Sequence, residues 1–478
     1  MHLDDSTSAL AFLQNDPAAV HLVGACGSGM SSLAGLLLQM GCGVTGSDLA
    51  APTISLRQLQ RLGARVVLGH DATHVPAATR LLVHSPAVSP TNPELTEARR
   101  LGIPVLSYTQ MLGQLMRDRE GIAIAGTHGK STTTALLGWI LQQADLEPSI
   151  VVGAEMRGSN SGGRFGRGRQ ILVEACEYRR GFLDLKPEMA VLLGLEPDHF
   201  DCFASPAEAL DAFTEFASSV PDDGVLFANA DCPQTRNLAE STATHVTWFS
   251  RSQFNGWRVS DVCPVETGLL FRVHHGANTH SDVELPLSGR HHVHNALAAI
   301  AVAAELGVRA EQIESAVASF PGLRRRFEDL GTHAGVTIVD DYAHHPTAIT
   351  GTIRAARSRY PNRRVVCVYE PHQYSRAHSL FDEFTLALSA ADEVLITPVF
   401  TARETVSSDV CDELTKRMAA AIQTKETRAH MCASLDHVLA TLDDSLQPGD
   451  VLLTMGAGQV DRIPHEFIGR FSKHSEAG

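Results

Sequence analysis

The segment "GIAIAGTHGKSTTTALL", from Gly121 to Leu137, constrains the fold more than any other stretch of the chain. Its apolar start, Ile122 to Ala125, predicts a buried strand, and the residues after Lys130 predict a helix. A glycine turn that joins a strand to a helix can bind phosphate, because glycines admit backbone N–H groups to the oxygens and the helix N-terminus is electropositive. The residues alone also leave open a plain helix start capped by Thr127 or Ser131.

The turn is shorter than the usual phosphate-binding loop. The usual loop has four residues between its two glycines, whereas only Thr127 and His128 separate Gly126 from Gly129 here. The lysine that follows would add positive charge, and the hydroxyl of Ser131 would ligate a phosphate-bound magnesium ion. We therefore expect a phosphate cradle of a shorter type.

Apolar strands alternate with helical patterns along the chain, which predicts parallel sheets covered by helices. A length of 478 residues suggests about three domains at roughly 150 residues each. The charged "MRDREG" and the proline and glycine of "SFPGLRRRFE" mark the boundaries. We expect an α/β protein with a Rossmann-like domain at 1–119, a central ATPase domain of the P-loop type with a mostly parallel sheet at 120–323, and a Rossmann-like C-terminal domain at 324–478.

Charge and cysteine usage narrow the class of protein. The formal net charge is −15, whereas proteins that bind nucleic acids or membrane surfaces usually show basic patches. The nine cysteines include no Cys-x-x-Cys pair, which favours a reduced compartment over a disulfide framework or a structural zinc site. The acidic N-terminus does not resemble a signal peptide, and no apolar run reaches about 18 residues. We expect a cytoplasmic protein without nucleic-acid or membrane partners.

A second glycine turn, Gly24 to Gly29, lies in "VHLVGACGSGM". Asp48 ends the next strand about 20 residues later, where a carboxylate can meet a ribose hydroxyl. Diphosphate binding at this helix start is one interpretation, and a tight strand–helix turn is the other. A nicotinamide dehydrogenase would also carry such a turn, but it would leave residues 121–137 unexplained.

Polar residues follow two apolar strands of the central segment. Glu174 ends the strand in "QILVEACE", and His199 follows the strand in "EMAVLLGLEPDHFD". Ligands gather at the carboxyl ends of parallel strands, so we expect both side chains to meet the hydroxyl of Ser131 around metal ions that bridge ATP oxygens. Taken alone, His199 is more typical of a capping or buried histidine, and Glu174 fits either role.

Histidines cluster in "GRHHVHNA", "DDYAHHPT" and "EPHQYSR". The first cluster opens a helix, and Asn295, about one turn in, is placed to read the edge of a base. The other two follow strands of the third segment, where His372 and Arg376 would hold a carboxylate or a phosphate. Solvated loop histidines are the alternative for any single cluster.

Together these motifs resemble the Mur ligase family, the ATP-dependent enzymes that form amide bonds in bacterial cell-wall precursors. The family's short loop, Gly-Thr-x-Gly-Lys-[Ser/Thr], matches Gly126 to Ser131. A histidine at position 128 is typical of the branch that adds L-alanine and of the related enzyme that recycles muropeptides. "GLRRRFE", "DDYAHHPT", "PHQYSR" and "GAGQVDRIP" resemble the third domain of the alanine-adding branch, and "HLVGACGSGMSS" with "GCGVTGSD" resembles its first.

The resemblance implies ATP and Mg²⁺ as cofactors, and UDP-N-acetylmuramate and L-alanine as substrates of a monomer or homodimer. The implied ATP-binding residues are Gly126, Thr127, His128, Gly129, Lys130, Ser131, Thr132, Asn295, Arg326 and Asp340. The implied UDP-sugar-binding residues are Gly24, Gly27, Ser28, Gly29, Met30, Ser31, Asp48 and Ser85. The implied metal ligands are Ser131, Glu174 and His199, and the amino-acid and acyl site comprises His344, His372 and Arg376. The catalytic residues would be Lys130, Glu174, His199, His344 and Arg376.

The chain departs from the family pattern at two places. Cys26 stands where the first loop usually has glycine, and Cys176 stands where an aspartate is usual. The segment "DCFASPAEALDAFTEFASSV" has no lysine, whereas several relatives use a carbamoylated lysine there, and this agrees with the alanine-adding branch. Two alternatives remain: a recycling ligase that adds a tripeptide to the same UDP-sugar, and a non-catalytic UDP-sugar-binding protein.

Overall fold

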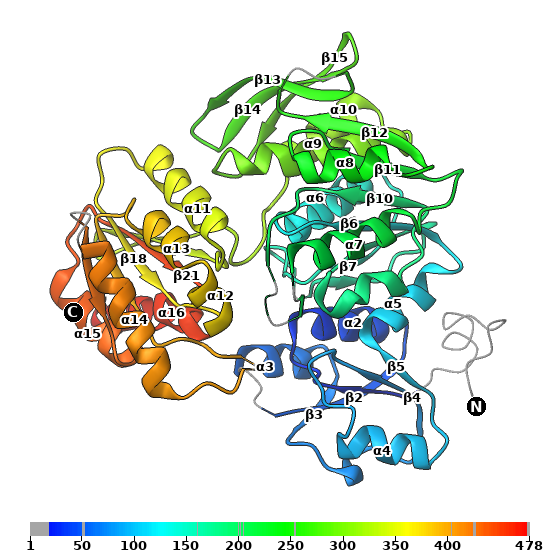
Figure 1. The fold of residues 1–478 in the computed structure, drawn as a ribbon, viewed down its shortest axis with the longest axis horizontal. Coiled ribbons are helices and arrows are strands. Elements are labelled where there is room, and N and C mark those ends of the chain that lie inside the picture. Colours follow the sequence, from blue (N-terminus) through cyan, green and yellow to red (C-terminus); the bar gives the residue numbers. More distant parts are fainter. Residues whose placement is uncertain are drawn as a thin grey trace.

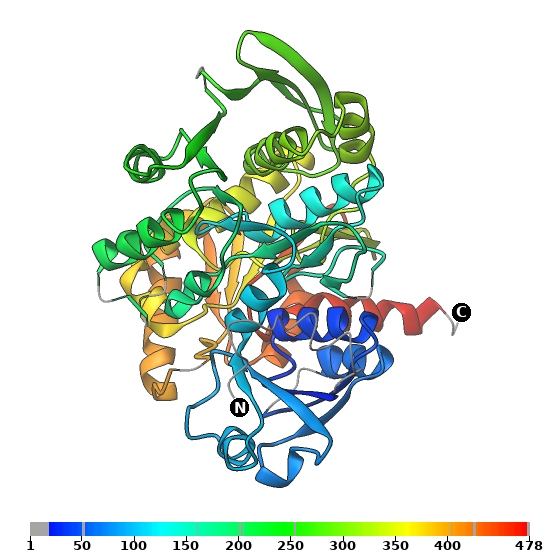
Figure 2. The same cartoon turned by 90° about the vertical axis from the view of Figure 1, so that its right-hand side faces the viewer.

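The computed structural model describes residues 19–49, 53–159, 161–198, 200, 202–203, 205–252, 255–402, 404–423 and 427–475. The strands form three sheets, one after another along the chain. In Figure 1 these sheets belong to three bodies, coloured blue, cyan to green, and yellow to red, and Figure 2 shows them from the side. The expected three-domain α/β fold with mostly parallel sheets is confirmed. The boundaries at 119/120 and 323/324 stay a proposal.

The first sheet is parallel, with the strand order β3-β2-β1-β4-β5. Its strands are β1 (Ala19–Val23), β2 (Gly43–Asp48), β3 (Arg65–Leu68), β4 (Thr79–His84) and β5 (Val105–Ser107). Its helices are α2 (Ser28–Gln39), α3 (Thr53–Arg61), α4 (Pro93–Arg100) and α5 (Tyr108–Met116), with a 3-10 turn, η1 (Ala72–His74). The order reverses between β1 and β4, and ligands of open α/β sheets bind at such a reversal. Gly24 and Ser85 follow the ends of these two strands.

The second sheet has the order β15-β14-β13-β12-β11-β10-β6-β9-β7-β8. Its strands are β6 (Glu120–Ala125), β7 (Ser149–Val151), β8 (Gly163–Arg164), β9 (Gln170–Glu174), β10 (Met189–Leu192), β11 (Val225–Asn229), β12 (His245–Ser250), β13 (Trp257–Pro264), β14 (Leu269–His275) and β15 (Asn278–Leu285). The helices are α6 (Lys130–Gln143), α7 (Pro206–Ala217), α8 (Pro233–Glu240), α9 (His291–Glu305) and α10 (Ala310–Ala318), with a 3-10 segment, η2 (Tyr178–Asp184). Strand β6 leads into the glycine turn from Gly126 to Ser131, which we call the phosphate loop. It lies between β9 and β10, and both pairings are parallel.

The sequence analysis did not predict the antiparallel meander of β13, β14 and β15. Buried and exposed residues alternate along most of β14, which is the pattern of a strand with one solvated face. The meander extends the central sheet at the top of Figure 1, next to α9 and α10.

The third sheet has the order β16-β17-β21-β18-β19-β20, and only the pair of β16 and β17 is antiparallel. Its strands are β16 (Glu328–His333), β17 (Val336–Asp341), β18 (Val365–Tyr369), β19 (Glu393–Ile396), β20 (Arg428–Met431) and β21 (Val451–Met455). The helices are α11 (Pro346–Arg359), α12 (Tyr374–Ser379), α13 (Phe381–Leu388), α14 (Ser408–Gln423), α15 (Leu435–Ser445) and α16 (Arg462–Ser475), with a 3-10 turn, η3 (Gln459–Asp461). The four strands expected in this segment are confirmed as β17, β18, β19 and β21.

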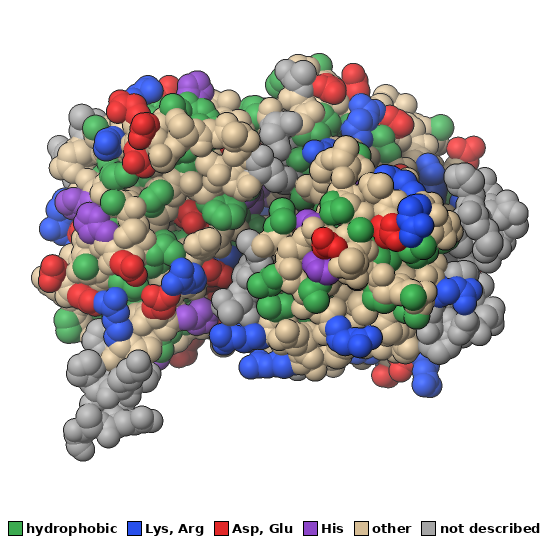
Figure 3. Space-filling view, turned by 90° about the horizontal axis from the view of Figure 1, so that it is seen from below, with side chains coloured by type: hydrophobic (Ala, Val, Ile, Leu, Met, Phe, Trp, Pro, Cys, Tyr) green, Lys and Arg blue, Asp and Glu red, His purple; other side chains and the backbone are tan. Residues whose placement is uncertain are grey.

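Acidic and basic side chains are interspersed on the face shown in Figure 3. Within the described ranges, no helix is both long enough and apolar enough to span a bilayer. All nine cysteines lie in the described part of the chain, and none forms a disulfide.

Helix α9 is buried on almost every side and carries one buried and one partly buried histidine. His292 is buried, and the ring of His294 packs edge-on against Phe249, with 5.1 Å between the ring centroids. The Nε2 atom of His294 is buried and lacks a hydrogen-bond partner among the described residues. Burial, assisted by the charge of Arg251, lowers the pKa of His294 to about 4, and burial also lowers the pKa of His292.

We expect the protein to lose stability as the pH falls from 6.5 towards 4. In this window the unfolded chain, whose histidines regain a pKa near 6.5, binds more protons than the folded chain, so the free energy of unfolding decreases. At pH 5 the lowered pKa of His294 should reduce the free energy of unfolding by on the order of 1–2 kcal/mol. Urea unfolding at pH 7.5 and pH 5 measures this loss, and His294→Phe should reduce it. An equal loss in the variant would show that His294 does not contribute.

Candidate active site

The phosphate loop begins where β6 ends and is held by the loop that follows β10. Gly126 and Gly129 have φ angles of +131° and +83°, which L-residues with a side chain rarely adopt. The backbone N–H of Thr127 donates to the carbonyl of Gly194 at 2.8 Å, and the Thr127 hydroxyl accepts from the N–H of Glu196 at 2.9 Å. Helix α6 starts at Lys130, so the N-terminus of the helix faces this turn, as expected.

Lys130 lies folded back over the loop in a nearly buried ion pair. Its ammonium donates to the carbonyl of Gly126 at 2.5 Å and to the carboxylate of Glu177 at 3.0 Å. The side chains of the pair are 11% and 4% exposed. Burial alone would lower the pKa of Lys130, but the charge and hydrogen bond of Glu177, together with the nearby Cys176 and Glu174, outweigh burial and raise it, so this residue stays cationic. Glu177 was not among the predicted site residues.

Ser131 and Glu174 meet, as the sequence predicts. Glu174 ends β9 in register with Ile124 of β6, and its carboxylate accepts from the Ser131 hydroxyl at 2.9 Å and from the N–H of Gly153 at 2.7 Å. Oxygen donors of this kind are the ligands that Mg²⁺ prefers. The pair therefore fits a magnesium site. Thr132 is buried one residue further along α6, and His199 lies outside the described residues.

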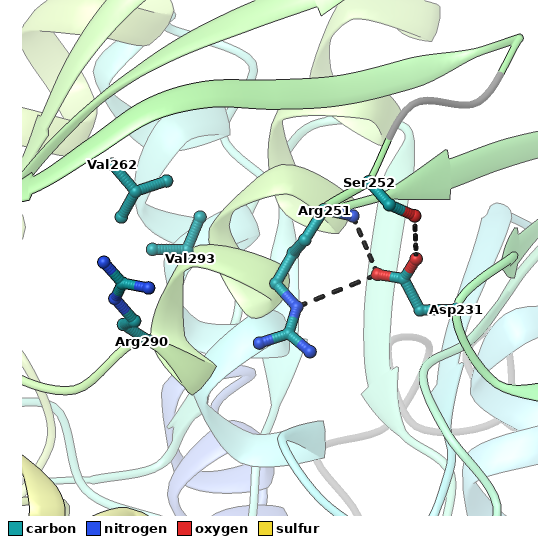
Figure 4. Close-up of a pocket in the computed structure, with 6 residues that line it drawn as sticks. All are labelled: Asp231, Arg251, Ser252, Val262, Arg290 and Val293. Atoms are coloured by element: carbon teal, nitrogen blue, oxygen red, sulfur yellow. Dashed lines mark hydrogen bonds and ion pairs between the residues drawn. The ribbon is translucent and has the colours of Figure 1, made fainter.

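Asn295 lies directly beside the phosphate loop. It is buried on α9, and a Cβ atom added to Gly129 would collide with its amide oxygen. The first turn of the same helix borders a cavity of about 280 Å³, shown in Figure 4. Two arginines, an acid, a serine and two valines line it: Arg251, Arg290, Asp231, Ser252, Val262 and Val293. Asp231 accepts hydrogen bonds from the backbone N–H of Arg251 at 2.7 Å and from the hydroxyl of Ser252 at 2.8 Å, which fixes this wall.

The third domain reaches the phosphate loop through Arg326. Its guanidinium donates to the Ser131 hydroxyl at 3.1 Å and lies 5.0 Å from the centre of the Tyr342 ring. The neighbouring Arg325 points into the third domain instead, where it donates to Asp340 at 3.1 Å. The hydroxyl of Thr454 donates to the other oxygen of Asp340 at 2.7 Å. The third domain supplies two of the predicted ATP-binding residues. Arg326 contacts Ser131 at the end of the loop, whereas Asp340 is buried within its own domain.

The predicted amino-acid residues form one cluster against the central domain. Arg376 donates from Nε to the carboxylate of Asp198 at 2.6 Å, and these side chains are 3% and 8% exposed. Arg376 also contacts Nδ1 and the carbonyl of His372, and the ring of His344 lies 5.7 Å from that of His372. Burial, together with the charge of Arg376, lowers the pKa of His344 well below 6.5. His344 is therefore neutral at pH 7.

The first glycine turn, Gly24 to Gly29, is held by hydrogen bonds to residues of its own domain. The N–H of Gly24 donates to the carbonyl of Ser47 at 2.9 Å, and the N–H of Cys26 donates to the carboxylate of Asp48 at 2.8 Å. Ser85 lies against Gly24, because a Cβ there would be 2.9 Å from the Ser85 Cβ. Helix α2 begins at Ser28, with Gly27 as its N-cap, and it carries Gly29, Met30 and Ser31 in its first turn.

This turn also lies close to the Ser131–Glu174 pair of the central domain. A Cβ placed on Gly153 would be 3.0 Å from the carboxylate of Glu174 and 3.7 Å from the hydroxyl of Ser28. On α2, Ser32 donates to the carbonyl of Val152 at 2.6 Å. The start of α2, the Ser131–Glu174 pair and Arg326 thus bring all three domains to one place.

Comparison with known proteins agrees with this architecture. Residues 19–120 match the catalytic domain of the Mur ligase family, residues 124–303 its middle domain, and residues 325–458 its glutamate ligase domain. The UDP-N-acetylmuramate–L-alanine ligase of Nitratidesulfovibrio vulgaris is 38% identical over 95% of this chain and 99% of its own length. The enzyme of the same name from Chlorobium phaeobacteroides is 38% identical over 95% of this chain and 98% of its own length.

Solved structures show the same fold. The UDP-N-acetylmuramate–alanine ligase of Thermotoga maritima superimposes with a TM-score of 0.82 at 24% identity, over 95% of this chain and 99% of that one. A murein peptide ligase of Psychrobacter arcticus gives 0.73 at 25% identity, over 95% and 98%. With three family domains matched in order and relatives aligned over nearly their whole length, this chain belongs to the Mur ligase family.

Proposed function

We propose that this protein joins L-alanine to the lactyl carboxylate of UDP-N-acetylmuramate and converts ATP to ADP and phosphate, as a step of peptidoglycan precursor synthesis. The observation that carries the proposal is the convergence of three domains on the phosphate loop. The relatives that are 38% identical over 95% of the chain are named for this reaction. The net charge and the nine unbridged cysteines support a cytoplasmic setting.

ATP phosphates would bind between the glycine turn and the N-terminus of α6. Gly126 to Ser131 supply backbone N–H groups and the positive end of the helix, with Thr132 behind them. Lys130 would exchange part of its contact with Glu177 for a phosphate. Ser131 and Glu174, with His199, would hold Mg²⁺, which neutralises charge on the transferred phosphate when it is bound. His128 and Arg326 border the same space.

The base of ATP would lie near the first turns of α9. Asn295 presents an amide beside Gly129, and an amide can pair with the edge of adenine. The cavity of about 280 Å³ is at the lower end of ligand pockets, which span about 300–1,000 Å³, so it suits a single base better than a whole nucleotide. Arg290 and Arg251 offer planar guanidinium groups for stacking on that base.

The UDP-sugar would bind at the reversal of the first sheet. Gly24 and Gly27 to Ser31 form the start of α2, where a diphosphate is favoured, and Ser85 completes the turn. One carboxylate oxygen of Asp48 would accept a hydrogen bond from the ribose, while the other still accepts from the backbone N–H of Cys26. The start of α2 lies near Glu174, so a muramate held there has its lactyl carboxylate directed towards the γ-phosphate.

The reaction would then proceed in two steps within the closed domains. The lactyl carboxylate attacks the γ-phosphorus and forms an acyl phosphate, with ADP as the leaving group. The amine of L-alanine attacks the acyl carbon, and phosphate leaves. Arg376 would bind the alanine carboxylate with the part of its guanidinium that faces away from Asp198, beside His372. Neutral His344 is suited to accept the proton that the amine nitrogen loses as the C–N bond forms, and the third domain would exclude water.

A coupled phosphate-release assay tests the proposed function. We expect rapid release only when UDP-N-acetylmuramate, ATP and L-alanine are all present. Replacing L-alanine by the tripeptide L-alanyl-γ-D-glutamyl-meso-diaminopimelate should give little or no release. Turnover with the tripeptide alone would assign the protein to muropeptide recycling, and binding of the UDP-sugar without any turnover would make it a non-catalytic binding protein.

We expect Glu174→Gln to shift the magnesium dependence of turnover to higher concentration. The amide keeps the shape of the side chain but lacks the charge that a hard cation prefers, and second-sphere changes alone often cost about 10–100-fold in metal affinity. A titration of activity against Mg²⁺ measures the shift. Glu188→Gln, a change just before β10 of the same domain and outside the site, serves as the control. An unchanged titration would mean that Glu174 only holds the Gly153 backbone.

A further inference from the structure

Three side chains at the seam between the central and third domains form a cluster that the proposed reaction does not use as a unit. His128 comes from the phosphate loop, Glu196 from the loop after β10, and His345 from the N-cap of α11. One nitrogen of each histidine and a carboxylate oxygen lie within 4.8 Å of one another. The hydroxyl of Thr347 donates to the same carboxylate at 2.6 Å.

The distances from the two histidine nitrogens to the Glu196 carboxylate are close to those between ligands of a small tetrahedral cation. Nε2 of His128 lies 3.2 Å from Oε2 of Glu196, and Nδ1 of His345 lies 3.6 Å from the same oxygen. Zinc binds nitrogen and oxygen at about 2.0–2.2 Å in tetrahedral sites, so its neighbouring ligands are about 3.3–3.5 Å apart. The two observed distances bracket this value. Two imidazoles and one carboxylate are a donor set that zinc uses with an open fourth position.

We propose that His128, Glu196 and His345 form a binding site for Zn²⁺ or a cation of the same class, separate from the Ser131–Glu174 site for Mg²⁺. Its ligands come from two domains, so an occupied site holds the third domain against the central one. It also withdraws His128 from the nucleotide. Zn²⁺ bound here should therefore inhibit turnover.

Titration of the nucleotide-free, full-length protein with Zn²⁺ alone, against a chromophoric chelator, tests the site. We expect one tight site in the wild type, and a loss of affinity of about tenfold or more in Glu196→Gln and in His345→Ala. His437→Ala and Glu215→Gln, which change exposed residues elsewhere, are the matched controls and should bind like the wild type. Added Zn²⁺ should raise the melting temperature of the wild type more than that of either site variant.

Two outcomes would overturn the proposal. One is a wild-type protein without a tight site, and the other is a tight site that both Glu196→Gln and His345→Ala leave unchanged. If His345→Ala does not fold, Glu196→Gln and His128→Asn decide. The titration involves neither ATP nor the UDP-sugar, so its result does not depend on whether the proposed ligase reaction is correct.

Discussion

Lys130→Ala should lower kcat by about a hundredfold or more, the size of effect seen when a preorganised electrostatic group is removed. Lys130 is the one cationic side chain of the loop from Gly126 to Ser131, and its ammonium lies within the turn that would hold the phosphates. Steady-state phosphate release with all three substrates saturating measures the loss.

The same substitution should also destabilise the fold, because it leaves the nearly buried carboxylate of Glu177 without its ion-pair partner. The double variant Lys130→Ala/Glu177→Gln separates the two effects. We expect it to recover most of the lost urea midpoint and none of the lost activity. Near-normal activity in the single variant, or recovery of activity in the double variant, would contradict a role for Lys130 in binding phosphate.

Arg376→Lys should reduce kcat/KM for L-alanine by about tenfold or more. Truncation of a buried, hydrogen-bonded charge costs about 2–5 kcal/mol, and lysine keeps the charge but lacks the planar fork. In the structure the guanidinium contacts Asp198 through Nε and His372 through a terminal nitrogen. A lysine ammonium cannot keep both contacts and also bind the carboxylate of alanine. The loss should appear in the KM for alanine, in kcat, or in both.

The affinity of the enzyme for ATP alone should stay nearly unchanged in Arg376→Lys. The phosphate loop, Glu174 and Asn295 all belong to the central domain, whereas Arg376 lies on α12 of the third. Equilibrium binding of ATP to the variant measures this, and Arg462→Lys, at an exposed position of the same domain, is the control. A collapse of ATP binding with intact alanine kinetics would reverse the division of roles between the two domains.

Sequence patterns predicted the parts of the site that lie at the ends of buried strands. Gly126 follows one apolar run and Glu174 ends another; the length and composition of these runs mark them as strands, and parallel pairing of β6 with β9 then places the two ends together. The antiparallel meander, β13 to β15, was missed because its alternation of buried and exposed residues was not separated from the surrounding α/β pattern.

Side-chain contacts between distant loops, both within and between domains, could not be read from the sequence. Glu177, Glu196 and Asp198 lie within motifs that were noticed, "EACEY" and "LEPDHFD", but only the fold shows which of them meet Lys130, His128 and Arg376. Arg325 and Arg326 illustrate the same limit. They are adjacent, yet one points to Asp340 inside its domain and the other to Ser131 across the seam.

In the proposed mechanism, the phosphate loop and the third domain activate the muramate carboxylate by phosphoryl transfer. Its most direct test is turnover of UDP-N-acetylmuramate labelled with ¹⁸O in the lactyl carboxylate, with mass spectrometry of the released phosphate. Attack of the carboxylate on ATP followed by displacement by alanine carries one labelled oxygen into the phosphate, and this is the result we expect. Unlabelled phosphate released in step with the formation of the alanyl product would contradict the acyl-phosphate mechanism.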